Sequence, residues 1–293
     1  MKRNLSILSF IFLVLLRSYG LDKKDSVSNV SVEPGQIKVA TYNIRYPSPM
    51  DDSSGNGWDK RKKPLVELMQ LHQFEIIGTQ EGYSSQLKDM KEMMPGFDYV
   101  AYRYGSQKVK HNCATYYKTD LFDVLDDGVF WLSQTPDIPS IGWDADDQRI
   151  CQWTKFKVKK TGKIFYVFNV HFYWRLKTAK AESGPLLIKK IREIAGNLPV
   201  LCMGDFNSVV NSPQIKAMKE SLFDSYDPVD MASQDVKGTA AAGGDFVTVP
   251  HQRIDYIFHT KHFEVKDCKI LTDVYNGNHH PSDHLPVTAL LSF

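Results

Sequence analysis

The chain has 293 residues, of which 42% are hydrophobic and 12% aromatic, so it is long and apolar enough to bury a large core. Lys and Arg together number 36 against 34 Asp and Glu, which leaves a net charge of only +2. This balance argues against a chain built for general electrostatic binding of nucleic acid, although a local basic rim is compatible with it.

The N-terminus has the pattern of an export signal. Met1-Lys2-Arg3 is basic, an apolar run extends from Leu5 to Leu16, and small residues follow around Ser18. The run is shorter than the ~20 residues that a transmembrane helix needs. We therefore interpret residues 1–20 as a cleaved signal peptide, with an uncleaved anchor as the alternative, and expect an exported protein that is periplasmic or secreted.

Residues 21–35 are polar and are predicted to form a flexible segment, and residues 36–293 are predicted to form the folded domain. The four cysteines have no CxxC spacing, which excludes the usual zinc and redox motifs. Export permits a disulfide, and Cys113 with Cys151 is the first pair to test. Buried free thiols are an equal alternative.

Strands and helices alternate through the first half of the chain. Apolar alternation predicts strands at 37–44 and 75–81, and helical spacing predicts helices at 61–73 and 84–94. Pro64 is expected in the first turn of the first helix, where proline is tolerated. Further strands are predicted at 99–104, 114–118 and 125–132.

The second half continues in the same way. A hairpin joins predicted strands at 150–158 and 164–172, and a helix at 176–195 should kink or restart at Gly184-Pro185. Next are a buried strand from Leu198, a short helix after Ser212-Pro213, a flexible Gly/Ala loop at 238–244, and strands at 253–258 and 287–293. With no linker between the halves, we expect one α/β domain in which two sheets pack face to face with helices outside.

Polar side chains gather at or just beyond the ends of these strands: Asn43, Glu81, His171, Asp205, Asn207, Asp255, Asp283 and His284. Singly, some have ordinary explanations: Glu81 as a helix cap, Asp255 as a partner of Arg253, His171 as a core histidine. Together they fit a ligand site, because ligands of α/β sheets bind at the carboxyl ends of strands. Carboxylate and amide oxygens suit Mg²⁺, and two histidines supply acid–base groups, which is a set suited to phosphoester hydrolysis.

Six short motifs occur in order along the chain: 41–45 (TYNIR), 80–81 (QE), 169–171 (NVH), 204–207 (GDFN), 253–256 (RIDY) and 282–284 (SDH). They resemble the motifs of the endonuclease/exonuclease/phosphatase superfamily, the DNase I-like metal-dependent phosphoesterases. The resemblance covers residues 36–293. It implies a four-layer α/β sandwich of two packed mixed β-sheets flanked by helices, and Mg²⁺- or Mn²⁺-dependent hydrolysis of a phosphoester.

The resemblance also implies roles for the polar residues. Glu81 would be the principal metal ligand, with Asn43 and Asp283 at or near the ion. His284, held by Asp255, would be the general base or a clamp on the phosphate. By the same resemblance Asp205 and Asn207 would orient water and phosphate, and His171 would stabilise or protonate the opposite side. Whether His284 or Asp205 takes the proton of water stays open.

Besides Gly184-Pro185 in the predicted helix, two segments depart from the family pattern, Tyr173-Trp174 and the plain loop 238–242. We consider three functional hypotheses. The first is an exported metal-dependent phosphodiesterase, phosphatase or nuclease. The second is a catalytically silent binding protein on the same fold, and the third is a sphingomyelinase-like lipid phosphodiesterase. The substrate class, whether nucleic acid, sugar phosphate or lipid head group, is not resolved by these motifs. No obligate protein partner is indicated, and a monomer is expected.

Overall fold

The computed structural model describes residues 33, 35–105, 110–175, 177–228, 236–241 and 243–293. The predicted signal peptide and most of the predicted flexible segment lie outside these residues. Within them, no helix has the length and apolar character needed to cross a membrane.

The strands are β1 (Gln36–Asn43), β2 (Ile76–Gln80), β3 (Phe97–Tyr104), β4 (His111–Lys118), β5 (Phe122–Trp131), β6 (Ile150–Val158), β7 (Ile164–His171), β8 (Val200–Asp205), β9 (Phe223–Asp224), β10 (Asp255–His259), β11 (Glu264–Ile270) and β12 (Val287–Ser292). The helices are α1 (Pro49–Ser53), α2 (Trp58–Leu71), α3 (Ser84–Met93), α4 (Lys177–Ala195) and α5 (Pro213–Lys219). The strands form two six-stranded mixed sheets, with the orders β11-β12-β1-β2-β4-β3 and β5-β6-β7-β8-β10-β9.

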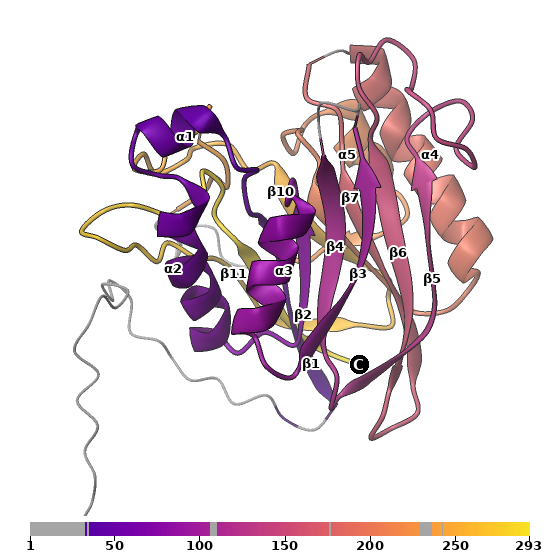
Figure 1. Ribbon diagram of the computed structural model, residues 1–293. Helices are drawn as coiled ribbons and strands as arrows, with labels where there is room; N and C mark the ends of the chain where they lie inside the picture. The colour runs from indigo at the N-terminus through magenta and orange to yellow at the C-terminus, as the bar shows by residue number, and fades with distance from the viewer. Residues whose placement is uncertain (1–32, 34, 106–109, 176, 229–235, 242) are drawn as a thin grey trace, which may run out of the picture.

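Three layers of buried apolar side chains separate four layers of backbone. Between the sheets lie residues such as Val39 and Ile76 of one sheet and Phe165 and Met203 of the other. Helices α2 and α3 cover the outer face of the first sheet, and α4 and α5 cover the outer face of the second (Figure 1). The predicted four-layer sandwich is therefore confirmed.

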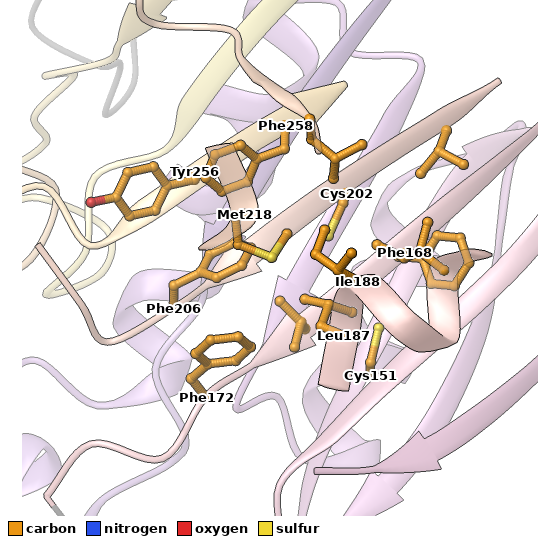
Figure 2. Packing of buried hydrophobic residues seen from close by; sticks show 14 of the residues in the cluster. Cys151, Phe168, Phe172, Leu187, Ile188, Cys202, Phe206, Met218, Tyr256 and Phe258 are labelled. Atoms are coloured by element: carbon orange, nitrogen blue, oxygen red, sulfur yellow. The ribbon is translucent and has the colours of Figure 1, made fainter. Parts of the chain in front are cut away.

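The layer under α4 and α5 shows how the sequence builds this packing (Figure 2). Leu187 of α4 and Met218 of α5 lie among Phe168, Cys202 and Phe258, which come from three neighbouring strands. Successive strand residues point to opposite faces, so the outward-facing positions of β7, β8 and β10 pack against these helices. Their other face lines the layer between the sheets.

The two sheets approach closely at Gly78 of β2. A Cβ at this position would lie 2.9 Å from Met203 Sδ and 3.2 Å from Asn169 Cγ. Asn169 links the sheets, since its amide donates to the carbonyl oxygens of Thr79 and Ala114, each at 3.0 Å. The close approach brings the strand ends of both sheets to one place.

Several predicted boundaries were wrong. Helix α2 begins at Trp58, so Pro64 lies in its interior and not in the first turn. Helix α4 runs through Pro185 as one element, and the predicted restart is absent. Gly184 has a packing reason, because a Cβ there would lie 2.7 Å from the carbonyl oxygen of Gln214, the second residue of α5. The pattern also missed α1, β9 and β11.

All four cysteines are buried and free: Cys113, Cys151, Cys202 and Cys268. The alternative of buried thiols holds, and the candidate disulfide between Cys113 and Cys151 is absent.

Candidate active site

The predicted site residues converge on one edge of the sandwich. Strands β1 and β2 are parallel, as are β7 and β8, so Asn43, His171 and Asp205 at their last positions reach the same edge. Strands β10 and β12 run antiparallel to β8 and β1. Their N-terminal ends therefore bring Asp255 and the 282–284 segment to that edge from the other direction.

Asp205 lies at the centre of this group and is 1% exposed. Its Oδ2 accepts a hydrogen bond from Asn43 Nδ2 at 3.1 Å, lies 3.4 Å from His171 Nε2, and lies 3.9 Å from His284 Nε2. Its Oδ1 accepts from the backbone N–H of Asn207 at 2.8 Å. The turn that follows β8 thus fixes the carboxylate against both imidazoles.

Asn207 does not point its amide nitrogen at this centre. Its backbone φ is +49°, and its Nδ2 donates to the carbonyl oxygen of Phe172 at 3.0 Å. The side chain joins the loops that follow β7 and β8, and its role toward water and phosphate stays a prediction.

His284 and Asp255 form the predicted pair. His284 Nδ1 lies 3.0 Å from Asp255 Oδ2, and the two residues are 9% and 1% exposed. Thr239 supports Asp255 by accepting its backbone N–H at 3.1 Å. The proposed partnership of Asp255 with Arg253 is wrong, because Arg253 binds Asp224 at 2.6 Å on β9.

The two histidines have opposite protonation preferences. Burial alone would lower the pKa of His284, but the Asp255 carboxylate outweighs it and raises that pKa well above its usual value. Burial, aided by the Arg149 cation, lowers the pKa of His171 well below its usual value. Burial and the nearby Asp255 charge raise the pKa of Asp205 to about 7. The site therefore holds a charged imidazole, a neutral imidazole and a carboxyl group poised near neutral pH.

Glu81 directly follows β2 with a backbone φ of +66°, a conformation that non-glycine residues seldom adopt. Its Oε2 accepts the backbone N–H of Tyr46 at 3.3 Å. Burial would raise the pKa of Glu81, but His111, His171, His284 and Arg45 bring it down to about 2. The carboxylate is therefore ionised and turned toward the cationic groups of the site rather than capping α3.

These donors fit a magnesium-type ion. Glu81, Asn43 and Asp205 offer hard oxygen atoms, which Mg²⁺ and Mn²⁺ prefer, and the half-buried carboxylate of Glu81, held ionised, is a ready ligand. Asp205, Asp255 and His284 also bring possible ligand atoms within 4.8 Å of one another. Since His284 is charged and bonded to Asp255, we interpret that cluster as acid–base machinery.

Asp283 is the least available of the predicted metal ligands. Its Oδ2 accepts the backbone N–H of Gly244 at 3.1 Å and lies 3.3 Å from Arg45 Nη1. Arg45 is in turn held by Asp51 of α1, with Nε 3.0 Å from Oδ2. The carboxylate of Asp283 is thus already paired with a cation, the guanidinium of Arg45. Its position beside a metal ion stays a prediction.

The sequence analysis missed His111, the first residue of β4, and Arg149, which directly precedes β6. His111 is 8% exposed, and its ring centroid lies 5.1 Å from that of Tyr46 and 5.7 Å from that of Tyr83. Arg149 has its guanidinium 5.5 Å from the Tyr104 ring and 5.4 Å from the Tyr173 ring. No local motif marks them, because their place depends on how the sheets pack.

Comparison with known proteins supports the family resemblance. The model of the Endonuclease/Exonuclease/phosphatase family matches residues 40–284. A family protein of Bacteroides thetaiotaomicron has a solved structure with 39% identity and a TM-score of 0.78, over 89% of this chain and 99% of that one. A mannosyl-6-phosphatase of the same organism is 39% identical with a TM-score of 0.77, over 88% of this chain and 100% of its own. An uncharacterized protein of Acanthamoeba polyphaga mimivirus is 26% identical, over 80% of this chain and 91% of its own.

Proposed function

Since the chain belongs to the endonuclease/exonuclease/phosphatase family, whose members hydrolyse phosphoesters, we propose that it is an exported Mg²⁺- or Mn²⁺-dependent phosphatase of sugar phosphates. The observation that carries this proposal is the buried His284–Asp255 pair beside Asp205, in a chain 39% identical to a mannosyl-6-phosphatase. Export rests on the sequence of residues 1–20.

The burial of the centre favours a small substrate with a terminal phosphate. His171 is 2% exposed, Asp205 1% and Asn43 0%, so the reacting atoms lie below the surface rather than on it. Arg45 and Arg149 supply positive charge there, while the whole chain carries only +2. A terminal phosphate needs local charge, whereas a long nucleic acid is held by many phosphate contacts.

Each group has a task in this reaction. A bound Mg²⁺ or Mn²⁺ supplies charge that polarises the phosphoryl oxygen, and Glu81 with Asn43 would hold it. His284, kept charged by Asp255, donates a hydrogen bond to a phosphoryl oxygen. Asp205, with its raised pKa, accepts the proton of the attacking water as the water oxygen bonds to phosphorus. The P–O bond to the sugar breaks, and the leaving sugar oxygen takes up a proton from solvent. This division assigns the role of base to Asp205 and that of clamp to His284.

The two departures from the family pattern do not support the silent binding protein. The Tyr173 hydroxyl donates to Asp146, and its ring packs on Arg149 beside the site. In the Gly/Ala loop, Ala240 forms a bridge to His284 and Thr239 is 0% exposed, so this part of the loop supports the catalytic pair. Both segments are built into the site.

The lipid hypothesis has one observation in its favour. Ile138 and Ile141, on the loop between β5 and β6, are 59% and 50% exposed, and Trp174 after β7 is 53% exposed. These apolar side chains lie on loops of the catalytic edge. They are single residues, which are common on soluble proteins, so the lipid reaction is the second candidate.

A substrate panel tests the proposal. After EDTA treatment, the purified protein is assayed with Mg²⁺ or Mn²⁺ on mannose 6-phosphate, glucose 6-phosphate, bis-p-nitrophenyl phosphate, single-stranded DNA and sphingomyelin. We expect metal-restored phosphate release, with kcat/KM highest for a sugar phosphate. Preference for DNA or sphingomyelin would replace the proposed substrate class, and inactivity on every substrate would support the silent binding protein.

A further inference from the structure

A hydrogen bond joins the two sheets beside His171. Tyr104 is the last residue of β3 in the first sheet, and His171 is the last residue of β7 in the second. Tyr104 Oη lies 2.6 Å from His171 Nδ1, the rings are nearly perpendicular at 85°, and the residues are 1% and 2% exposed. No role proposed above uses this contact.

We propose that Tyr104 is a positioning residue that fixes His171 as the tautomer protonated at Nε2, so that this imidazole donates a hydrogen bond at the catalytic centre. The proposal rests on the proposed function for its effect on the reaction. The tautomer itself follows from the contacts of the two ring nitrogens of His171.

The direction of the bond follows from the partners of the tyrosine hydroxyl. Burial raises the pKa of Tyr104 well above its usual value, so the hydroxyl keeps its proton. Among the described residues, His171 Nδ1 is the hydrogen-bond partner of this hydroxyl. A buried O–H without an acceptor is unfavourable, so the hydroxyl donates to Nδ1, which must then carry a lone pair.

The contacts of the other ring nitrogen of His171, Nε2, indicate the same tautomer. His171 Nε2 lies 3.4 Å from Asp205 Oδ2, an oxygen that already accepts a hydrogen bond from Asn43. A nitrogen lone pair facing an ionised carboxylate would be repelled, whereas an N–H is attracted. The single proton of the ring therefore belongs on Nε2.

The reverse arrangement has a cost that the structure identifies. If Asp205 carried a proton and donated it to Nε2, the ring would hold its proton at Nδ1 and donate to the Tyr104 oxygen. The tyrosine O–H would then have no acceptor among the described residues. A protein can adopt this arrangement only by leaving a buried donor unpaired, which the hydrogen-bonding rules disfavour.

The two imidazoles thus differ through what binds their Nδ1 atoms. His284 has a carboxylate there, which stabilises the charged ring, and His171 has a hydroxyl, which orients the neutral ring without charging it. His171 consequently offers an oriented N–H to a phosphoryl oxygen, and it is not the group that protonates the leaving oxygen. Of the two roles that the family resemblance implied for His171, stabilising or protonating the opposite side, the inference selects stabilising.

Nitrogen-15 NMR of protein labelled in histidine side chains tests the tautomer directly, with His171→Gln to assign the resonances. The metal-free wild-type protein is expected to show one protonated Nε2 and one unprotonated Nδ1 for His171. In Tyr104→Phe we expect a mixture of tautomers and a loss of kcat of about tenfold, the scale of one hydrogen bond, with KM within about twofold.

Tyr116→Phe is the matched control. It deletes another buried tyrosine hydroxyl, which donates to the carbonyl oxygen of Leu87 at 2.8 Å, and should leave the His171 resonances and kcat unchanged. A wild-type ring protonated at Nδ1, or a Tyr104→Phe protein with unchanged tautomer and unchanged kcat, would overturn the inference. The expected tautomer in a protein that hydrolyses no phosphoester would refute the proposed function and leave the assigned tautomer in place.

Discussion

Asp255 lies directly opposite Asp205 in the antiparallel pairing of β10 with β8. Two carboxylates at one register position would repel each other, and His284 offsets this repulsion, with Nδ1 3.0 Å from Asp255 and Nε2 3.9 Å from Asp205. Burial and the strand pairing therefore set the chemistry together: the Asp255 carboxylate stabilises the charged imidazole, and burial with the Asp255 charge raises the pKa of Asp205 to about 7.

A double-mutant cycle tests whether Asp255 and His284 act as one unit. We expect Asp255→Ala and His284→Ala each to lower kcat/KM by about 10²-fold or more, the scale of a positioned acid–base group. The double mutant should be little worse than the worse single variant, because both changes remove the same function. Steady-state kinetics at saturating Mg²⁺ decides, with circular dichroism as the folding control. Additive losses, or a nearly silent Asp255→Ala, would contradict the pairing.

Arg61 is expected to stabilise the loops that carry the site. It is 0% exposed and donates to the carbonyl oxygens of Ile44 at 3.0 Å and Pro281 at 2.9 Å, which tie the end of β1 to the 282–284 segment. Arg61→Met leaves these buried carbonyls unpaired and should lower the free energy of unfolding by about 3 kcal/mol. Urea denaturation measures it.

Lys63→Met serves as the control for Arg61, since the Lys63 side chain is 55% exposed and its pair with Glu67 spans 3.7 Å. We expect this change to stay within about 0.5 kcal/mol. Similar losses for both variants would show that Arg61 has no special part in holding the loops.

His259 should make stability fall on acidification. It is 6% exposed at the end of β10 that lies away from the site, and burial lowers its pKa below the usual value of 6.5. Protonation is therefore easier in the unfolded chain, so stability is full above about pH 6.5 and is lost as the pH falls below it.

The matched comparison is His259→Gln, studied by chemical denaturation at pH 8 and pH 5. The wild-type protein should lose more stability than the variant between these pH values, because the variant has no imidazole to protonate. An equal loss in the two proteins would show that His259 does not contribute to the acid sensitivity.

The strand-end residues could be predicted from sequence for a physical reason. Apolar runs that end in Asn43, His171 and Asp205 mark buried strands whose next positions must leave the core, and parallel pairing collects such ends at one edge. The helix at 61–73 was predicted to begin after the true start of α2, which is Trp58. Trp58 directly follows a Gly-rich loop, so the helical spacing of apolar residues is not evident there.

Contacts between residues of different strands, far apart in the sequence, were beyond the reach of pattern analysis. Tyr104 meets His171 across 67 positions of sequence, and Arg253 meets Asp224 across 29. Neither Tyr104 nor Asp224 stands in a motif, and each contact depends on how strands pair or how the two sheets face each other. Local sequence indicates which residues lie at the end of a strand. It does not indicate which residue of another strand they will contact.

The claim that metal-dependent hydrolysis occurs at this edge is tested most directly through Glu81. Glu81→Gln keeps the shape of the side chain and loses its charge, so we expect Mg²⁺ affinity, measured by calorimetry, to fall at least tenfold, and mannose 6-phosphate hydrolysis to fall with it.

Glu75→Gln is the matched control. Glu75 is buried just before β2, where it accepts the backbone N–H of Lys38 at 3.1 Å, far from the C-terminal end of that strand. The account predicts that calorimetry separates the two variants, with Mg²⁺ binding weakened only by Glu81→Gln. Unchanged Mg²⁺ affinity and unchanged activity in Glu81→Gln at limiting Mg²⁺ would contradict it.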